Sequence, residues 1–130
     1  MTIAKELKQL PWNFSIGNET QGIFRKLTEG ITTRIFSGEN VMLSVVKLEP
    51  NTAGTLHSHP EEQWGVLLEG ECVRIQGDEE LTLRAGDFWY TRCGASHGIR
   101  TAGIGATVLD TFSPPREEYK KQGEGFSSST

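Results

Sequence analysis

The histidines of the chain, and a glutamine close to two of them, are the residues best suited to chemistry. His57 and His59 are separated by one residue, so on an extended segment both imidazoles point to the same side. Gln63 opens the next apolar run and can meet them if the two segments are neighbours, and His97 follows a later apolar run. Three converging imidazoles are typical of a site for a divalent transition metal, so the sequence predicts one such ion: Zn, Ni, Mn or Fe. The alternative is surface histidines in polar loops, but every histidine of the chain belongs to this cluster.

Residue type alone leaves the fourth metal ligand open between Gln63 and the two glutamates that precede it. Glu61 has the same strand parity as the histidines, although Pro60 interrupts the strand there, and Glu62 is its neighbour. An amide oxygen from Gln63 is neutral and leaves the full charge on a divalent ion. Such an ion is a stronger Lewis acid, and it attracts an anionic substrate more strongly than an ion already bound to a carboxylate. A glutamine ligand therefore favours Lewis-acid chemistry on an anion over redox cycling.

A second set of candidate residues lies in the segment DTFSPPREEY, near the end of the chain. Asp110 and Phe112 share the parity of the apolar residues of 104–112, so they are expected to face the interior. Arg116 follows a stiff Pro-Pro turn that could hold it at the mouth of a pocket. Arginine binds carboxylates, phenylalanine packs on rings and aspartate moves protons, so the set would suit a small acid as substrate. The alternative for Arg116 is a polar exit from the last strand.

Short apolar and β-branched runs, separated by turn residues, must position these side chains. Strands are expected at 41–48, at 63–70 (closed by a glycine), at 87–91 and at 104–112, with a hairpin formed by CVRIQ and ELTLR. This spacing indicates an all-β sandwich or barrel. A short helix is expected over 3–10, ended by Pro11. Residues 1–130 are expected to form one domain, with the end of the tail 113–130 disordered.

Composition narrows the function classes. The chain carries 17 acidic and 13 basic residues, a net charge of -4, and no basic block, which argues against nucleic acid as a partner. No long apolar run indicates a signal peptide or membrane span, and Cys72 and Cys93 are too few for a disulfide framework, so a cytoplasmic protein is expected. Trp64 has the opposite parity to Gln63 and is expected to face outward. Exposed strand edges and this outward tryptophan predict a homodimer.

Two spaced motifs resemble those of the cupins. The first runs from Asn51 to Gly70 with the pattern N-x5-H-x-H-x3-Q-x6-G, and the second runs from Gly86 to His97 with the pattern G-x5-R-x-G-x2-H. The two are 15 residues apart, a spacing similar to that of small single-domain cupins. Asn51 stands where glycine is usual, and asparagine also tolerates turn geometry. Motif position favours Gln63 over either glutamate as the fourth ligand.

The tail motif Asp-x-Phe-x-Pro-Pro-Arg narrows the resemblance to the small cupins of the pectin-degradation type. Those proteins convert unsaturated uronates, released by polysaccharide lyases, into the linear keto form. The resemblance implies a jelly-roll barrel with a core over residues 40–112 and a small anionic substrate. It implies a metal held by His57, His59, Gln63 and His97, and a substrate-facing set of Asp110, Phe112 and Arg116. The alternatives are a cupin-type Fe(II) oxygenase and a non-catalytic metal- or ligand-binding cupin.

Overall fold

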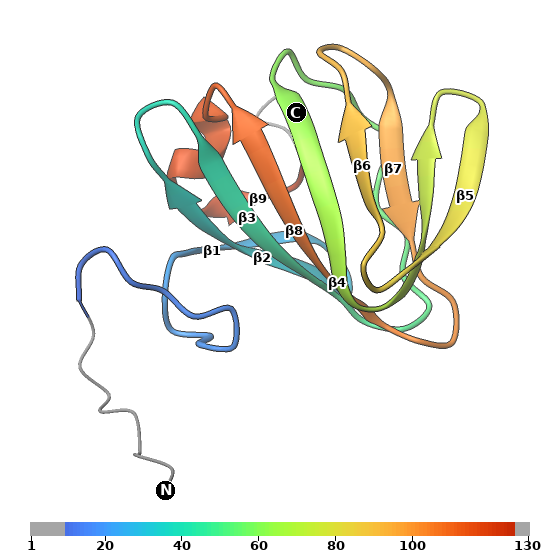
Figure 1. The fold of residues 1–130 in the computed structure, drawn as a ribbon, viewed down its shortest axis with the longest axis horizontal. Helices are drawn as coiled ribbons and strands as arrows, with labels where there is room; N and C mark the ends of the chain where they lie inside the picture. Colours follow the sequence, from blue (N-terminus) through green and yellow to red (C-terminus); the bar gives the residue numbers. More distant parts are fainter. Residues whose placement is uncertain (1–9, 127–130) are drawn as a thin grey trace, which may run out of the picture.

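The computed structural model describes residues 10–126, which are mostly β-strand (Figure 1). The elements are β1 (Ile23–Thr28), β2 (Ile31–Ser37), β3 (Met42–Leu48), β4 (Glu62–Gln76), β5 (Glu79–Arg84), β6 (Phe88–Thr91), β7 (His97–Arg100), β8 (Ala106–Ser113), the 3-10 helix η1 (Glu117–Lys120) and β9 (Gly123–Glu124). The strands are ordered β5-β4-β8-β3-β2-β1-β9, and β6 and β7 also pair with β4. The long strand β4 therefore connects every part of the sheet.

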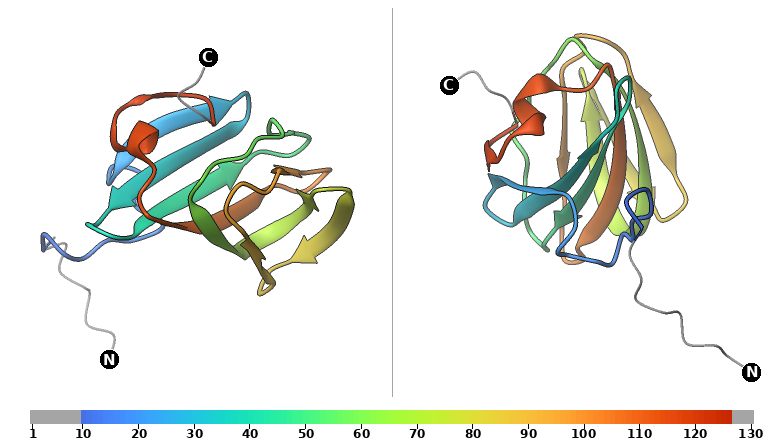
Figure 2. Two further views of the ribbon diagram at one scale, coloured as in Figure 1. Left: turned by 90° about the horizontal axis from the view of Figure 1, so that it is seen from above. Right: turned by 90° about the vertical axis from the view of Figure 1, so that its left-hand side faces the viewer.

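The two halves of β4 belong to different groups of strands. Residues 62–70 pair with β8, and within them 63–66 pair with β6 on the other side. Residues 71–76 pair with β5, and within them 73–76 pair with β7. The two groups curve around a shared interior (Figure 2). Apolar side chains fill much of it, including Leu27, Ile31, Ile35, Met42, Val46, Leu48, Leu67, Val108 and Phe112.

A β-bulge in β4 reverses which of its side chains face this interior. The pairing with β8 shifts register between Leu67 and Glu69, so one extra residue is inserted there. Gln63 and Leu67 are buried before the shift, and Cys72 and Arg74 are buried after it. In a regular strand Gln63 and Arg74 would face opposite sides, because strand side chains alternate. The bulge brings both into the interior.

The all-β barrel predicted from the sequence is confirmed. Strands occupy the positions expected near 41–48, 87–91 and 104–112, and β4 and β5 form the expected hairpin. Asn51 has a positive φ of 58°, the turn geometry for which asparagine is suited.

Two details of the strand prediction were wrong. The strand expected to end at Gly70 continues to Gln76, because glycine adopts the positive φ of 83° that carries the strand past the bulge. Ile104 was expected on the inward face of the last strand. It lies in the bend before β8 and is 60% exposed.

Two other expectations fall largely on residues outside the described range. Of the helix expected over 3–10, only Leu10 belongs to the residues that the structure describes. The end of the tail, 127–130, lies outside them. Within the described residues the tail forms η1 and β9. No helix of this part of the chain is long and apolar enough to cross a membrane.

Replacement of Gly70 by alanine should strongly destabilise the protein. A Cβ there would lie 1.9 Å from the carbonyl oxygen of Gly105, at a positive φ that disfavours side chains. Gly77→Ala is the matched control, because its φ is also positive at 59° but nothing lies within 4 Å of the added Cβ. In urea denaturation we expect the free energy of unfolding to fall by at least about 3 kcal/mol at Gly70 and by about 1 to 2 kcal/mol at Gly77. Equal losses would contradict the close approach of Gly105 to Gly70.

Candidate metal centre

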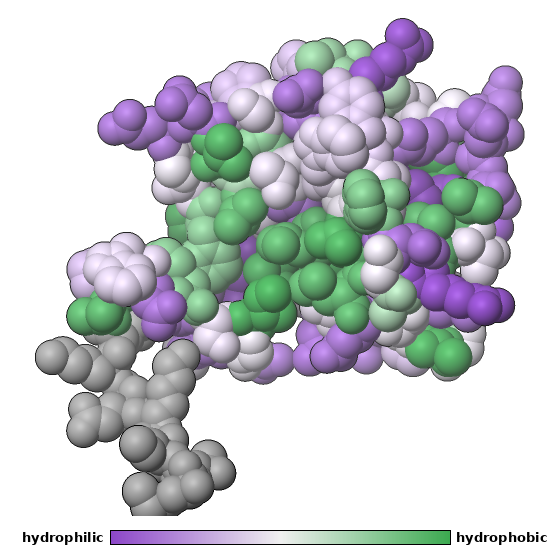
Figure 3. All heavy atoms as spheres, viewed as in Figure 1, coloured by the Kyte–Doolittle hydropathy of each residue, from purple (hydrophilic) through white to green (hydrophobic). Residues whose placement is uncertain are grey.

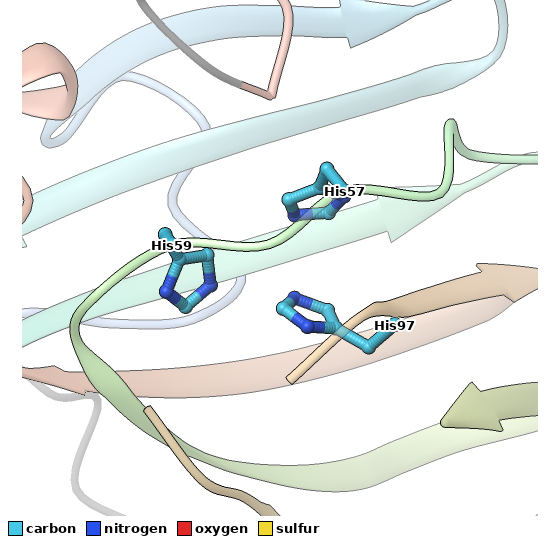
Figure 4. Close-up of side chains that lie close together, drawn as sticks. All are labelled: His57, His59 and His97. Carbon is cyan, nitrogen blue, oxygen red and sulfur yellow. The ribbon is translucent and has the colours of Figure 1, made fainter. Parts of the chain in front are cut away.

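The three histidines converge, as their spacing predicted (Figure 4). His57 and His97 exchange two backbone hydrogen bonds, of 3.0 and 2.9 Å, that fix the loop before β4 beside the start of β7. His59 packs edge-on against Phe112 of β8, with ring centroids 5.4 Å apart. One ring nitrogen from each histidine lies within 4.8 Å of the other two. The group could hold a metal ion, and because ligands at about 2.1 Å from an ion are at most about 4.2 Å apart, the rings would draw together slightly around it.

Backbone carbonyls orient all three rings. In each histidine the Nδ1 nitrogen lies at hydrogen-bond distance from a carbonyl oxygen, so Nδ1–H donates and Nε2 keeps its lone pair. The partners of His57, His59 and His97 are the carbonyls of Thr55, Glu61 and Ala95, at 2.8, 3.0 and 2.8 Å. This is the tautomer that a metal ligand requires.

Two Nε2 atoms lack the partner that this tautomer needs. The Nε2 of His97 is buried and has no hydrogen bond within residues 10–126. The Nε2 of His59 lies 3.0 Å from Oε1 of Gln63, which places two lone-pair acceptors face to face. Such an arrangement is unfavourable by itself and becomes favourable when a cation accepts both lone pairs. The donor set of imidazoles and an amide oxygen therefore fits a divalent transition metal.

The three candidates for the fourth ligand occupy different positions. Gln63 is 3% exposed and its amide faces the Nε2 side of His59. Glu61 is on the opposite, Nδ1 side of that ring, with its carboxylate 3.5 Å away. Glu62 accepts a hydrogen bond of 2.8 Å from the hydroxyl of Tyr90 at the surface. Of the three, only Gln63 has an oxygen beside an Nε2 atom.

Burial keeps the imidazoles neutral. It lowers the pKa of His57 to about 4 and that of His97 to about 3. It also lowers the pKa of His59, assisted by the nearby positive charge of Arg116. Near neutral pH the three rings are therefore unprotonated and able to bind a cation.

A small cavity of about 30 Å³ adjoins the cluster. His57, Gln63 and His97 line it, together with Asp110 of β8. The Oδ1 atom of Asp110 is buried without a hydrogen-bond partner in the described chain, and burial raises the pKa of this carboxyl. A carboxyl group that retains its proton more easily than usual thus lies in the same cavity as the imidazoles. Phe112, the next inward-facing residue of β8, also lines it.

The C-terminal segment covers this cavity. Phe126 lines it and places its ring 4.8 Å from that of His57. Arg25 of β1 holds the segment by three hydrogen bonds of 2.8 Å to the carbonyls of Glu118, Glu124 and Gly125. The segment crosses above β1 and β2 in the left view of Figure 2.

Arg116 is more deeply placed than the sequence suggested. It was expected at the mouth of the pocket, but only 1% of it is exposed. Its guanidinium donates to Oε1 of Glu118 at 3.0 Å and to the carbonyl oxygen of Phe126, and it lies 3.9 Å from the centroid of the Tyr119 ring. It is not among the residues that line the cavity, because Phe126 and Tyr119 lie there instead.

Sequence reasoning missed Arg74, which lines the cavity. In CVRIQ the apolar Val73 and Ile75 share one face, and that face would be taken as the inward one. The bulge in β4 inverts this, so Arg74 is buried and both apolar residues are only half-buried. An arginine flanked by apolar residues in a predicted hairpin strand was the available signal.

The cluster should bind about one metal ion per chain, as one set of ligands predicts. Replacement of His57 and His97 together by alanine should abolish binding, because two of the three imidazoles are then missing. Elemental analysis of the purified proteins measures this. Glu62→Ala is the control and should retain the metal, since its carboxylate bonds to Tyr90 at the surface. Full metal content in the double variant would contradict the assignment of His57 and His97 as metal ligands.

Acid should destabilise the metal-free protein through the same histidines. Their folded pKa values, about 4 for His57 and about 3 for His97, lie below the ordinary 6.5, so the unfolded chain binds more protons below pH 6.5. The free energy of unfolding should therefore be highest above that pH and fall as pH decreases toward 4, by up to about 1.4 kcal/mol per pH unit and histidine. Urea denaturation at several pH values measures this slope.

The control for this pH dependence is a variant with His57→Asn and His97→Asn. It lacks both imidazoles but retains the Asp110 carboxyl, whose raised pKa acts in the opposite direction. We expect a shallower slope in the variant than in the wild type. Equal slopes would mean that these histidines are not the groups that titrate.

Comparisons with known proteins show the family to which the chain belongs. The pectin degradation protein KdgF of Dickeya dadantii (strain 3937) is 26% identical over 108 residues, which cover 82% of this chain and 96% of that protein. The structure of KdgF from Halomonas sp. superimposes with a TM-score of 0.70 at 24% identity, over 78% of this chain and 95% of that one. An RmlC-like cupin from Shewanella frigidimarina NCIMB 400 gives a TM-score of 0.71 at 22% identity, over 82% and 96%. The cupin domain model matches residues 44–112, more than half of the sequence, and the chain therefore belongs to the cupin family.

Proposed function

We propose that this protein is a metal-dependent enzyme that converts an unsaturated uronate into its linear keto form. The observation that carries the proposal is the cavity that His57, His97 and Asp110 line together, because it places two histidines of the metal-binding cluster and a buried carboxyl group around one space. The similarity to a protein named for pectin degradation supports the same substrate class. A divalent ion held by His57, His59, Gln63 and His97 would supply Lewis-acid polarisation of a substrate oxygen.

Asp110 is the group proposed to move the proton. Opening of the cyclic form removes a proton from a hydroxyl group, and formation of the ketone adds one to a carbon of the double bond. Burial raises the pKa of Asp110, which brings it closer to the value that suits a group acting as both acid and base near neutral pH. Its Oδ1 atom has no competing hydrogen bond in the described chain.

Binding of a uronate would require the C-terminal segment to move. A cavity of about 30 Å³ holds one or two water molecules and no sugar ring. Displacement of Phe126 would enlarge it and release the guanidinium of Arg116, which now donates to the Phe126 carbonyl. Arg116 could then bind the carboxylate of the substrate, and Phe112 could pack against the ring.

The proposed reaction can be followed by loss of the near-ultraviolet absorbance of the conjugated double bond. The metal-loaded protein should accelerate this loss with unsaturated galacturonate, mannuronate or guluronate. Asp110→Ala should lower kcat by about 100-fold or more with the metal still bound, because proton transfer by a positioned side chain is worth that much. If the wild type leaves all three substrates untouched, the proposal fails in favour of an oxygenase or a binding protein.

Arg116→Ala tests the carboxylate contact separately. It should mainly raise KM, because binding of the substrate carboxylate is common to the ground state and the transition state. Arg84→Ala is the control, since Arg84 is exposed on β5. Unchanged KM in a folded Arg116→Ala protein would remove this residue from the substrate site.

We further propose that the protein acts as a homodimer in the cytoplasm. Both cysteines are free thiols, which suits a reducing compartment. An apolar patch lies over β3 and β8 in the view of Figure 3, and Val41, Leu43, Val45 and Leu109 line a groove of about 710 Å³ there. Trp64 is 49% exposed beside Tyr90, with ring centroids 4.9 Å apart. A second copy would cover this surface.

Sedimentation at micromolar concentration should therefore give the mass of a dimer. Leu43→Glu should shift the protein toward monomer, because a charge would be buried in the proposed interface. Leu81→Glu on β5 is the control, since Leu81 is 64% exposed and lies outside the groove. A wild-type monomer would refute the dimer.

A further inference from the structure

Arg74 is a buried cation without an anionic partner. It is 6% exposed, in the half of β4 that lies between β5 and β7. Among residues 10–126 no carboxylate oxygen lies within 4.0 Å of its guanidinium. The other two buried arginines differ from it. Arg25 donates to three backbone carbonyls, and Arg116 pairs with a glutamate and a carbonyl.

Neutral groups hold the Arg74 guanidinium in one orientation. Nε donates to Oε1 of Gln76 at 3.2 Å, and Nη2 donates to Oγ1 of Thr91 at 2.8 Å. The guanidinium lies 5.4 Å from the ring centroid of Trp89. That ring lies against Gly65, where a Cβ would approach it to 2.5 Å. Nη1 makes no hydrogen bond to the described residues, so one edge of the guanidinium is positioned but unused.

This arrangement places a positive charge without an ion pair on the cavity wall. Arg74 lines the same cavity as His57, His97 and Asp110. Removal of a guanidinium from water costs several kcal/mol unless an anion compensates it. Asp110 lines the same cavity, but no oxygen of its carboxyl group lies within the 4.0 Å of an ion pair with the guanidinium. A bound cation at the histidines would add further positive charge.

We propose that Arg74 binds an anionic oxygen of the ligand, a carboxylate, at the inner end of the cavity. Arg116 donates to the Phe126 carbonyl and could reach the carboxylate only after the C-terminal segment moves, whereas Arg74 already lines the cavity, so the two arginines would contact different oxygens of the same carboxylate. The inference builds on the proposed function, since in a uronate the anionic group is the carboxylate. Arg74 would then select acids over neutral sugars of the same size.

The test measures the binding of D-galacturonate and D-galactose to the metal-loaded protein by calorimetry. These sugars do not carry the reactive double bond and differ at the carboxylate. Wild type should bind the acid at least about tenfold more tightly, the scale of one charge-assisted hydrogen bond. Arg74→Met should lose this preference, and Arg74→Lys should retain part of it. Arg100→Met is the control, because Arg100 pairs with Glu80 at the surface and should change nothing.

Thermal unfolding separates a binding role from a structural one. Arg74→Met removes an unpaired buried charge and keeps a side chain of similar length, so Tm should not fall. A large fall in Tm in both the methionine and lysine variants would assign Arg74 a structural role and overturn the proposal. Wild-type affinity for D-galacturonate in Arg74→Met would also overturn it.

Formate binding distinguishes this inference from the proposed reaction. If the protein converts unsaturated uronates but Arg74→Met keeps its affinity for D-galacturonate, the inference fails and the reaction stands. If uronates are not converted but wild type binds formate and Arg74→Met does not, the anion site stands and the reaction fails. Wild type that binds neither D-galacturonate nor formate overturns the anion site.

Discussion

The site depends on one constraint on β4: the first half of this strand must turn one face to the interior, and the second half must turn the opposite face to it. Its first half pairs with β8 and its second half with β5 and β7. The bulge between Leu67 and Glu69 resolves the conflict by one inserted residue, and Gly70 adopts the backbone conformation that follows. As a result Gln63, beside the histidines, and Arg74, on the cavity wall, are brought to the same space.

Exclusion of water then gives these groups their chemistry. The imidazoles are neutral because burial disfavours their charged form, and the carbonyls at their Nδ1 atoms direct the Nε2 lone pairs inward. The same exclusion favours a protonated Asp110 and leaves the Arg74 charge uncompensated. Several polar atoms around the cavity therefore lack partners within the described chain, and a cation and an anion together would satisfy them.

The C-terminal segment covers the cavity, and a substrate could enter only if this segment moved. Two buried arginines hold its carbonyls, and Phe126 closes the cavity against His57. Its own strand, β9, has only two residues, and among the described strands it pairs only with β1. A short segment with few ladder hydrogen bonds opens at low cost compared with the core strands.

The sequence by itself determined the elements with strong local signals. Alternating apolar residues predicted the strands. The spacing of His57 and His59 predicted that both imidazoles point to one side, because the side chains of residues i and i+2 of an extended segment do so, and the second motif added His97. Asp110 and Phe112 line the cavity because the regular alternation of β8 continues to them.

Only the tertiary structure decided the rest. Periodicity cannot reveal where an extra residue enters a strand, so the inward direction of Arg74 could not be counted from Gln63. Nor could local pattern show that Phe126 packs on His57, because the two are far apart in sequence and meet only through the path of the tail. Arg116 is buried beneath the same segment, where it donates a hydrogen bond to the carbonyl oxygen of Phe126. Each of these features depends on contacts between segments that are distant in the sequence. The side chains lose their contact with water only when those segments pack together in the folded chain.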